Sequence, residues 1–202
     1  MSGPTHVIRP FRVGDEERLA QICVRTGDAG QDASGQHSSD ALLPDIFALP
    51  YVTRHPDFAF VVDGPDAVVG YIVAAPDTNA FYEWFREVWW PPRRSRYADA
   101  TGAPDPRDAH FVAHADGLRA GAEEHAARYP AHLHIDLLPE AQGRGLGRSL
   151  IRMLTEKLQA SGVPGLYLVA SATNAGAVAF YPRVGFKALP SAEGVRAFGM
   201  IL

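Results

Sequence analysis

The sequence predicts an α/β fold in which helices cover a mixed sheet, and three observations support this prediction. Short runs of β-branched and aromatic residues alternate along the chain with stretches whose apolar residues recur at helical spacing. The apolar run 133–138 is followed at once by a glycine-rich loop and by the helical pattern 148–160, an order typical of α/β layers. The 202 residues suffice for one substantial core and contain no internal repeat, so we expect a single domain over residues 1–202.

The N-terminal segment predicts a strand and then a helix. Residues 6–9 read as a short strand, and apolar residues between 19 and 23 recur at helical spacing, with Asp15 placed to cap the helix. Cys23 is the only cysteine and lies within this apolar pattern, so we expect a buried apolar residue rather than a catalytic thiol. The absence of a charged segment followed by an apolar signal core favours a cytoplasmic location.

A loop, a second helix and a hairpin are expected next. Residues 26–39 are rich in Gly, Ser, Asp and Gln and predict a mobile loop, after which Asp40 is placed to cap a helix over 41–49. The runs 58–62 and 68–74 are β-branched and aromatic, and the Asp-Gly-Pro-Asp sequence between them signals a hairpin. These two strands are therefore expected to lie side by side.

A long segment, about residues 76–131, separates the third expected strand from the fourth. Its second part shows a further helical pattern over 111–128. Two interpretations stay open for its aromatic residues: they form a lid or wall over a substrate pocket, or they bury area in extra core or in a homodimer surface. The aromatic residues are Phe81, Tyr82, Trp84, Phe85, Trp89 and Trp90.

The C-terminal part continues the alternation of helices and strands. Gly162 and Pro164 mark the end of the helix over 148–160. The elements expected after it are a strand over 166–169, a helix from Ala175 and closing strands near Lys187 and over 198–202.

The loop Gln142–Gly147, with the sequence Gln-Gly-Arg-Gly-Leu-Gly, has the properties of an anion site. Glycines let the backbone approach an anion closely, and the first turn of the following helix leaves amide N–H groups unpaired at the positive end of its dipole. The loop lacks the Lys-Ser/Thr pair of a P-loop, and its glycines fall at alternate positions rather than in the pattern of dinucleotide-binding loops. The sequence therefore indicates a phosphate site of another kind.

Two motifs in this order resemble the GNAT N-acetyltransferase family. The loop matches the Gln-x-x-Gly-x-Gly signature of that family, and residues 174–186 match its Asn-x-x-Ala-x-x-Phe-Tyr-x-x-x-Gly-Phe block. The resemblance implies the GNAT acyl-CoA N-acyltransferase fold, here with a long helical insertion between strands 3 and 4. It also implies acetyl-CoA (coenzyme A) as co-substrate and direct transfer of the acetyl group to a primary amine of a small molecule or peptide.

Four segments carry a more specific resemblance. Residues 50–58, 69–71, 134–137 and 180–181 look like parts of the C-terminal acetyltransferase-like domain of animal O-GlcNAcases, and the similarity spans roughly 43–202. That domain is regarded as a pseudo-acetyltransferase that has lost the glycine loop, whereas this chain keeps the loop. Two functions stay open: an active N-acetyltransferase, or a weak or inactive module for CoA binding or protein recognition.

The family resemblance assigns the cofactor contacts to the glycine loop and its neighbours. Backbone amides from Gly143 to Arg148 are expected to hold the pyrophosphate, and the backbone around Leu137 to pair with pantetheine and polarise the carbonyl. Arg144 or Arg148 adds a charge-assisted phosphate contact, unless both are solvated residues of the helix start. The expected cofactor-binding residues are Leu137, Gln142, Gly143, Arg144, Gly145, Leu146, Gly147, Arg148, Asn174 and Tyr181.

Two of these residues have a structural alternative as well. Asn174 matches the asparagine that bonds the pantetheine arm in the family, and it also suits the N-cap of the following helix. Tyr181 matches the tyrosine that protonates the CoA thiolate, while its alternative is an aromatic residue of the buried helix face. A phenol with a pKa of about 10 stays protonated at neutral pH and can donate.

The general base is expected on the fourth strand. Some family members carry a glutamate on the fifth strand, but here that position is Val169. His134 and Asp136 alternate with apolar residues, so both project from one face of the fourth strand. Asp136 is the predicted base, acting directly or through water, and His134 is a second candidate. Binding of a cationic acceptor, or pairing within the sheet, are the alternatives for Asp136.

Charge and histidine spacing narrow the expected partners. The formal net charge of −4 gives no reason to expect nucleic acid or an anionic membrane, and no apolar run approaches the length of a membrane span. His110 and His114, and likewise His132 and His134, have spacings that suit a metal site. No cysteine or zinc-protease glutamate accompanies them, so we expect surface or core histidines and no metal.

Overall fold

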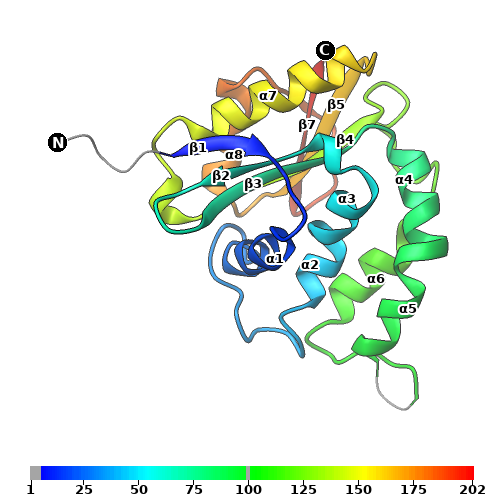
Figure 1. The fold of residues 1–202 in the computed structure, drawn as a ribbon. Coiled ribbons are helices and arrows are strands. Elements are labelled where there is room, and N and C mark those ends of the chain that lie inside the picture. Colours follow the sequence, from blue (N-terminus) through cyan, green and yellow to red (C-terminus); the bar gives the residue numbers. More distant parts are fainter. Residues whose placement is uncertain (1–5, 99–100) are drawn as a thin grey trace.

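A seven-stranded sheet forms the centre of the computed structural model, which describes residues 6–98 and 101–202 (Figure 1). The strands lie in the order β1-β2-β3-β4-β5-β7-β6, and among the described strands only β4 and β5 are parallel neighbours. The predicted mixed α/β fold is therefore confirmed, with a mostly antiparallel sheet. The strands are β1 Val7–Pro10, β2 Ala59–Asp63, β3 Val68–Ala75, β4 Ala131–Leu137, β5 Gly165–Ser171, β6 Lys187–Leu189 and β7 Val195–Ile201.

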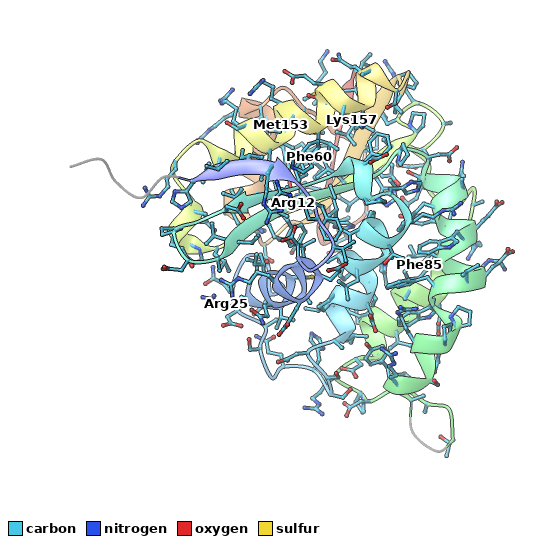
Figure 2. The ribbon with its side chains drawn as sticks, in the orientation of Figure 1. Arg12, Arg25, Phe60, Phe85, Met153 and Lys157 are labelled. Atoms are coloured by element: carbon cyan, nitrogen blue, oxygen red, sulfur yellow. The ribbon has the colours of Figure 1, made fainter. Side chains whose placement is uncertain are left out.

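Helices cover both faces of the sheet (Figure 1). On one face α7 contacts β1, β2 and β3 through a stripe that includes Leu150, Leu154 and Leu158, which recur every fourth residue. Phe60 of β2 belongs to the hydrophobic core, and Met153 of α7 packs against that core (Figure 2). On the other face lie α1, α2 and α3. The helices are α1 Glu16–Arg25, α2 Leu42–Phe47, α3 Leu49–Arg54, α4 Thr78–Trp84, α5 Pro91–Arg94, α6 Ala109–Gly117, α7 Leu146–Ala160 and α8 Ala175–Arg183. Within the described ranges, none of them is long and apolar enough to cross a membrane.

The two parallel strands pair over only a short length. Their ladder consists of two residue pairs, of which the last joins His132 of β4 to Tyr167 of β5. Beyond that point β4 stays paired with β3 as far as Leu137, and β5 stays paired with β7 as far as Ser171. Because each strand is held by its other neighbour, β4 and β5 diverge and leave an opening in the middle of the sheet.

The segment between β3 and β4 forms additional core. It contains α4, a π-helical turn Phe85–Trp89, α5 and α6, and most of its aromatic residues are buried. Trp89 donates its indole N–H to the carbonyl of Asp45 in α2 at 2.7 Å, and Arg93 lies over the Trp89 ring, 3.2 Å from its centroid. Tyr97 donates its hydroxyl to the Asp45 carboxylate at 2.7 Å. The insertion is therefore anchored to α2, as expected for core aromatic residues.

Two helix caps predicted from the sequence do not form. The Asp15 carboxylate accepts hydrogen bonds from the Arg9 guanidinium, at 2.7 Å, and from the backbone N–H of Arg12, and it makes no capping bond to α1. Asp40 accepts a hydrogen bond from the N–H of Gly35 within the preceding loop. Both capping predictions were wrong because partners outside the helix take the side-chain oxygens.

Two helices are shorter than predicted. The expected helix 41–49 breaks into α2 and α3, because Pro50 lacks an N–H and its ring would meet the carbonyl of Ile46 in a continuous helix. The pattern 111–128 is helical only in its first part, where α6 ends. Turns follow, in which Gly121 has a left-handed φ of 75°.

The single cysteine is part of the core. Cys23 lies on α1 with 4% of its surface exposed, which confirms the expected buried position. Burial raises the pKa of its thiol well above the ordinary value. The thiol is therefore neither ionised nor accessible at neutral pH.

Candidate active site

A cavity of about 980 Å³ lies where the glycine loop meets the opening between β4 and β5. We call it the loop cavity. Its walls come from the end of β4, the glycine loop, the start of α7, one side of α8 along its whole length and the loop after α1. It gathers most of the residues predicted from the sequence, namely Asp136, Leu137, Gln142, Gly143, Gly145, Leu146, Gly147, Arg148, Asn174 and Tyr181.

Backbone geometry explains why the loop carries three glycines. Gly143 and Gly145 have left-handed φ values of 70° and 78°, which a residue with a Cβ adopts only with strain. A Cβ at Gly147 would come within 3.1 Å of the Phe180 ring, so its absence lets α7 approach α8. Because α7 begins directly after Gly145, its first amide N–H groups have no partner within the helix. These amides form a positive cradle that suits a phosphate.

The polar side chains of the glycine loop and of the first turn of α7 differ in where they point. Gln142 donates its Nε2 to the Leu137 carbonyl at 2.9 Å and ties the loop to the end of β4. Arg148 lines the cavity and donates to the carbonyl of Arg183 at 3.0 Å. Arg144 instead turns back to a carbonyl that precedes the loop, and it does not line the cavity. Of the two arginines considered for a phosphate contact, only Arg148 is in place.

Several wall residues were missed by sequence reasoning. Arg183 follows Tyr181 by one half-turn of α8 and adds a second guanidinium to the loop cavity. A basic residue so close to the matched family block was a signal that could have been used. Thr26 and Gly30 reach the same cavity from the loop after α1. Nothing local in the sequence predicts their contribution, because the fold brings that loop to α8.

Asn174 is both a helix cap and a wall of the loop cavity. Its Oδ1 accepts a hydrogen bond from the N–H of Ala177 at 3.0 Å and so caps α8. Its Nδ2 faces Gly30, where a Cβ would approach it to 3.2 Å. Because capping uses only Oδ1, the amide N–H groups are left for a ligand. The two interpretations of Asn174 are therefore compatible.

Tyr181 also combines a structural position with access to the loop cavity. Its ring packs against Phe186 and Phe198, with centroid distances of 5.7 and 5.3 Å. Burial, together with the nearby carboxylate of Asp136, raises the pKa of the phenol above its ordinary value. The hydroxyl keeps its proton at neutral pH and can donate it to a developing anion.

Asp136 lines the loop cavity from the diverging part of β4. Its registered neighbour on β3, Tyr71, donates a hydroxyl to the carboxylate at 2.5 Å. Burial raises the pKa of Asp136 to about 6, because desolvation outweighs the stabilising hydrogen bond from Tyr71. The carboxylate is thus mostly ionised at neutral pH and more basic than an ordinary aspartate. Tyr71 was not predicted as a site residue, although its place opposite Asp136 follows from the strand register.

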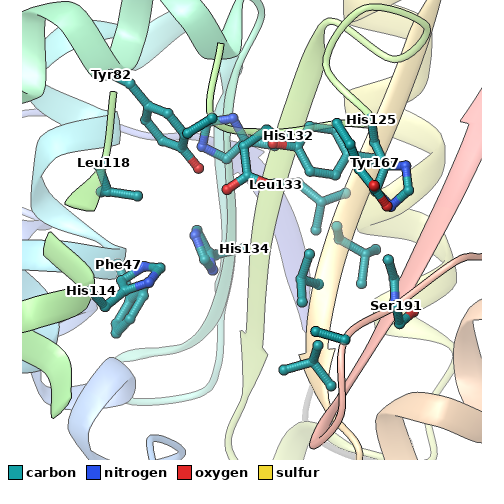
Figure 3. Close-up of a pocket in the computed structure, with 18 of the residues that line it drawn as sticks. Phe47, Tyr82, His114, Leu118, His125, His132, Leu133, His134, Tyr167 and Ser191 are labelled. Carbon is teal, nitrogen blue, oxygen red and sulfur yellow. Dashed lines mark hydrogen bonds and ion pairs between the residues drawn. The ribbon is translucent and has the colours of Figure 1, made fainter. Parts of the chain in front are cut away.

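A second cavity, of about 480 Å³, is lined by residues of the two diverging strands (Figure 3). We call it the histidine cavity. β4 contributes His134 to it and β5 contributes Val169, both beyond the last residue pair of the two strands. The next residues of β4, Ile135 and Asp136, line the loop cavity. The two cavities therefore meet along one strand.

A chain of hydrogen-bonded side chains backs the histidine cavity. Thr78 Oγ1 lies 2.7 Å from the carbonyl oxygen of Pro130 and 2.8 Å from Nδ1 of His132. The hydroxyl oxygen of Tyr51 lies 2.7 Å from Nε2 of His132 and 3.0 Å from Nε2 of His134. His134 and Asp136 both project toward the layer of α1 to α3, as the alternation along β4 predicted.

The Pro130 carbonyl at one end of this chain of side chains fixes the direction of every hydrogen bond in it. A carbonyl only accepts, so Thr78 donates its hydroxyl proton to Pro130. Thr78 then accepts from Nδ1–H of His132, whose Nε2 accepts from the Tyr51 hydroxyl. Tyr51 in turn accepts from Nε2–H of His134. His134 is left with a lone pair on Nδ1, which no residue of the described ranges occupies and which a ligand can use.

Both histidines of the chain are neutral at physiological pH. Burial lowers the pKa of His134 to about 4 and lowers that of His132 well below its ordinary value. Val169, at the position of the family's glutamate, is 47% exposed on the rim of the histidine cavity. The proton acceptors beside the opening are therefore the Asp136 carboxylate and Nδ1 of His134.

The histidine pairs with metal-like spacing contact aromatic rings instead. His110 lies 5.2 Å from the Phe111 ring, and His114 lies 5.6 Å from the Phe47 ring. In residues 6–98 and 101–202, no group of three His, Cys, Asp or Glu side chains is arranged to hold a metal ion.

Known proteins of similar structure share this architecture. The crystal structure of a protein called SsHAT superposes with a TM-score of 0.91 at 37% sequence identity, over 98% of this chain and 98% of that one. The PaiA N-acetyltransferase from Thermoplasma acidophilum, solved in complex with coenzyme A, has a TM-score of 0.56 at 13% identity over 98% of this chain and 99% of that chain. The second similarity is one of fold alone.

Sequence comparison agrees with the fold. The rat (Rattus norvegicus) protein O-GlcNAcase is 22% identical over 191 residues, which make up 94% of this chain and 21% of the relative. The chain thus spans about a fifth of the length of the curated relatives that it matches in this way. A family model described as the acetyltransferase (GNAT) family matches residues 28–186. With most of its length matched and its sheet diverging beside the glycine loop, the chain belongs to the GNAT acetyltransferase family.

Proposed function

We propose that the protein is an acetyl-CoA-dependent N-acetyltransferase that transfers an acetyl group directly to a primary amine. The observation that carries this proposal is the meeting of two cavities along β4, with Asp136 on the wall of one and His134 on the wall of the other. The loop cavity suits a pyrophosphate with an extended arm, and the histidine cavity suits an amine. The coenzyme A complex of the Thermoplasma relative supports the choice of donor.

In this proposal the loop cavity binds acetyl-CoA, whose thioester supplies the activated acetyl group. The first amides of α7 and the Arg148 guanidinium face the pyrophosphate. Asn174 donates its Nδ2 to the pantetheine arm, whose amides pair with the free edge of β4 near Leu137. Arg183 adds a second positive charge to the same wall.

The chemical step requires a neutral amine, since an ammonium ion has no lone pair. Asp136 removes the proton, directly or through a water molecule, and its pKa of about 6 suits this task near neutral pH. The amine nitrogen attacks the thioester carbonyl, so that a C–N bond forms and the C–S bond breaks. Tyr181 donates its phenolic proton to the departing thiolate, which leaves as the free thiol, while the attacking nitrogen loses its second proton to water and Tyr181 is reprotonated from water. Nδ1 of His134 accepts a hydrogen bond that orients the amine.

A second candidate is a CoA-binding or protein-recognition module with little or no turnover. The observation in its favour is that β5 presents Val169, without a carboxylate, on the rim of the histidine cavity. The two candidates make different predictions about thiol release from acetyl-CoA across a panel of primary amines, with release in the absence of amine as the control. Release that depends on an amine supports the transferase. Calorimetric binding of acetyl-CoA without release for any amine supports the module.

The proposal extends to location and acceptor type. A cytoplasmic location is supported by the single cysteine, which leaves the chain without an internal disulfide. The acceptor is a small-molecule or peptide amine.

A further inference from the structure

One end of the histidine cavity carries polar groups that the proposed reaction does not use. Figure 3 shows Tyr82, His132 and Tyr167 gathered at this end, with His134 farther along the cavity. Tyr167 is 2% exposed, and its buried hydroxyl oxygen has no partner at hydrogen-bond geometry in the described part of the chain, although the hydroxyls of Thr78 and Tyr82 lie near enough to shift its pKa. A buried hydroxyl without a partner destabilises the folded protein. Its presence in a cavity wall therefore points to a ligand that bonds to it.

A carboxylate without a partner faces the same end. Glu123 lines the cavity from the turns after α6 and is partly buried, and its carboxylate forms no hydrogen bond or ion pair with the residues described. Tyr82 and Tyr167 line the same cavity, and the charge of Glu123 contributes to raising the pKa of both hydroxyls. Burial raises the pKa of Glu123 above its ordinary value, because desolvation outweighs the opposing influence of the neighbouring His125.

The cavity as a whole is acidic and aromatic. Its carboxylates are Glu123 and the exposed Glu124, which lies 3.2 Å from His125, and no lysine or arginine lines it. Four histidines also line it: burial lowers the pKa of His114, His132 and His134, and His125 is the imidazole that lies beside Glu124. The rings of Tyr82 and the other tyrosines offer π faces, which attract cations. The wall between the two ends is apolar.

We propose that this end of the histidine cavity binds a distal cation of the acceptor, which is therefore a linear aliphatic diamine or polyamine. This inference rests on the proposed acetyltransferase function. Glu123 pairs with the distal ammonium, the Tyr167 hydroxyl accepts one of its N–H bonds, and the ring of Tyr82 packs beside it. The other amine is the one that is acetylated, beside His134 and Asp136.

The geometry of β4 sets the spacing of the two nitrogens. His132 lies beside the site of the distal ammonium, because its strand partner is Tyr167. Ile135 is the first residue of β4 that lines the loop cavity. Three residues of strand correspond to about 10 Å. An aliphatic chain of that length places its methylene groups against the apolar wall. The cavity volume of about 480 Å³ is that of a small-molecule site.

Calorimetry with acetyl-CoA-free protein tests the site apart from turnover, using a linear diamine and the monoamine of equal chain length. The diamine is expected to bind at least about tenfold more tightly, because only it forms the charge-assisted contact with Glu123. Glu123→Gln should abolish this preference, whereas the matched control Glu124→Gln should retain it. Tyr167→Phe should reduce the preference without removing it. Equal affinity for the two amines, or an unchanged preference in Glu123→Gln, overturns the inference.

Thiol release with the same amines separates this inference from the proposed function. A higher kcat/KM for the diamine that is lost in Glu123→Gln supports both. Equal kcat/KM for the diamine and the monoamine overturns the acceptor assignment and leaves the transferase function standing. Glu123-dependent binding without release for any amine supports the cation site and contradicts transfer. Tighter binding of a lysine-rich peptide than of the diamine overturns the small-molecule assignment.

Discussion

Burial and a hydrogen bond act in opposite directions on the pKa of Asp136, and this pKa affects both the proposed catalysis and the stability of the fold. Burial raises its pKa from 3.8 to about 6, although the hydroxyl of Tyr71 stabilises the ionised form. A carboxyl group whose pKa is higher in the folded state stabilises the fold fully below its unfolded pKa, and this contribution is lost as the pH rises through about 6. The ionised carboxylate, which is the proposed base at neutral pH, therefore lowers the free energy of unfolding.

Replacing the carboxylate should reverse both effects. Asp136→Asn is expected to lower kcat/KM by about 100-fold, since general-base catalysis is lost. It should raise the free energy of unfolding at pH 8 by up to about 3 kcal/mol, with the difference vanishing near pH 4. Denaturant titrations at the two pH values measure the second effect. In the unmodified protein, activity should fall as the pH drops through about 6, and full activity in the variant would show that Asp136 has only a structural role.

Tyr181 gives a prediction of a different kind, because its hydroxyl acts only on the leaving group. Tyr181→Phe keeps the ring contacts with Phe186 and Phe198 and removes the proton donor. We expect kcat to fall by about tenfold or more while the affinity for acetyl-CoA changes little. Steady-state kinetics and calorimetry measure the two quantities. Unchanged turnover would remove the general-acid role from Tyr181.

The hydrogen-bonded chain behind the histidine cavity predicts unequal effects for two tyrosines. Tyr51→Phe leaves Nε2 of both His132 and His134 without a partner in a buried site, so the free energy of unfolding should fall by about 1–3 kcal/mol. Tyr167→Phe is the matched control, because its hydroxyl has no partner to lose within the described residues. Urea unfolding of both variants tests this, and equal losses would contradict the chain as described.

Among the secondary-structure elements, those with a strong local pattern were predictable and those set by distant contacts were not. The helices α7 and α8 and the strands of the sheet follow apolar periodicity and turn residues. The predicted caps at Asp15 and Asp40 do not form, because the guanidinium of Arg9 and the backbone N–H of Gly35 bind these carboxylates instead. The predicted helix 41–49 is divided in two before Pro50, and this proline is a local signal that the sequence itself contains.

The same distinction applies to the candidate site. The phosphate cradle is one contiguous stretch, so its glycine spacing could be read from the sequence. The histidine cavity is assembled from α3, α4, β4 and β5, which supply Tyr51, Tyr82, His134 and Tyr167. No short motif joins these four residues. Sequence reasoning found His134 through strand alternation and could not find the others.

The glycine loop allows a prediction about an element rather than a side chain. Gly145→Ala and Gly194→Ala both place a Cβ at a left-handed φ, 78° and 81°, with no neighbour within 4 Å. Each should cost about 1 kcal/mol of stability for the same conformational reason. Only Gly145→Ala should also weaken acetyl-CoA binding, because its Cβ projects into the cradle. Thermal unfolding and calorimetry compare the pair, and equal affinities for acetyl-CoA would contradict the placement of the pyrophosphate.

At the scale of the whole molecule, the insertion between β3 and β4 has two roles. Most of its aromatic residues form core against α2, yet Tyr82, Leu118 and Glu123 from the same segment line the histidine cavity. The two interpretations of the segment, core and pocket wall, therefore apply to different residues of it. In the proposed function, the sheet and the glycine loop provide the donor side, and the insertion shapes the acceptor side.

The two adjoining cavities also predict the order of the reaction. In the proposed function, donor and acceptor occupy separate spaces that meet at β4, so both are expected to bind before the acetyl group moves. We expect intersecting lines in double-reciprocal plots with varied acetyl-CoA and amine, and no acetylated protein in mass spectra of protein incubated with acetyl-CoA alone. Parallel lines with a covalent acetyl adduct would instead indicate a ping-pong mechanism.

Cys23 has a practical consequence for measuring motion in this protein. The chain has no other cysteine, and this one is sealed within the core with its thiol protonated. A cysteine introduced on the surface, for example Val13→Cys at a position 94% exposed, would be the sole thiol open to an alkylating dye or spin label. Probes can therefore be attached at one chosen position without first removing a native cysteine.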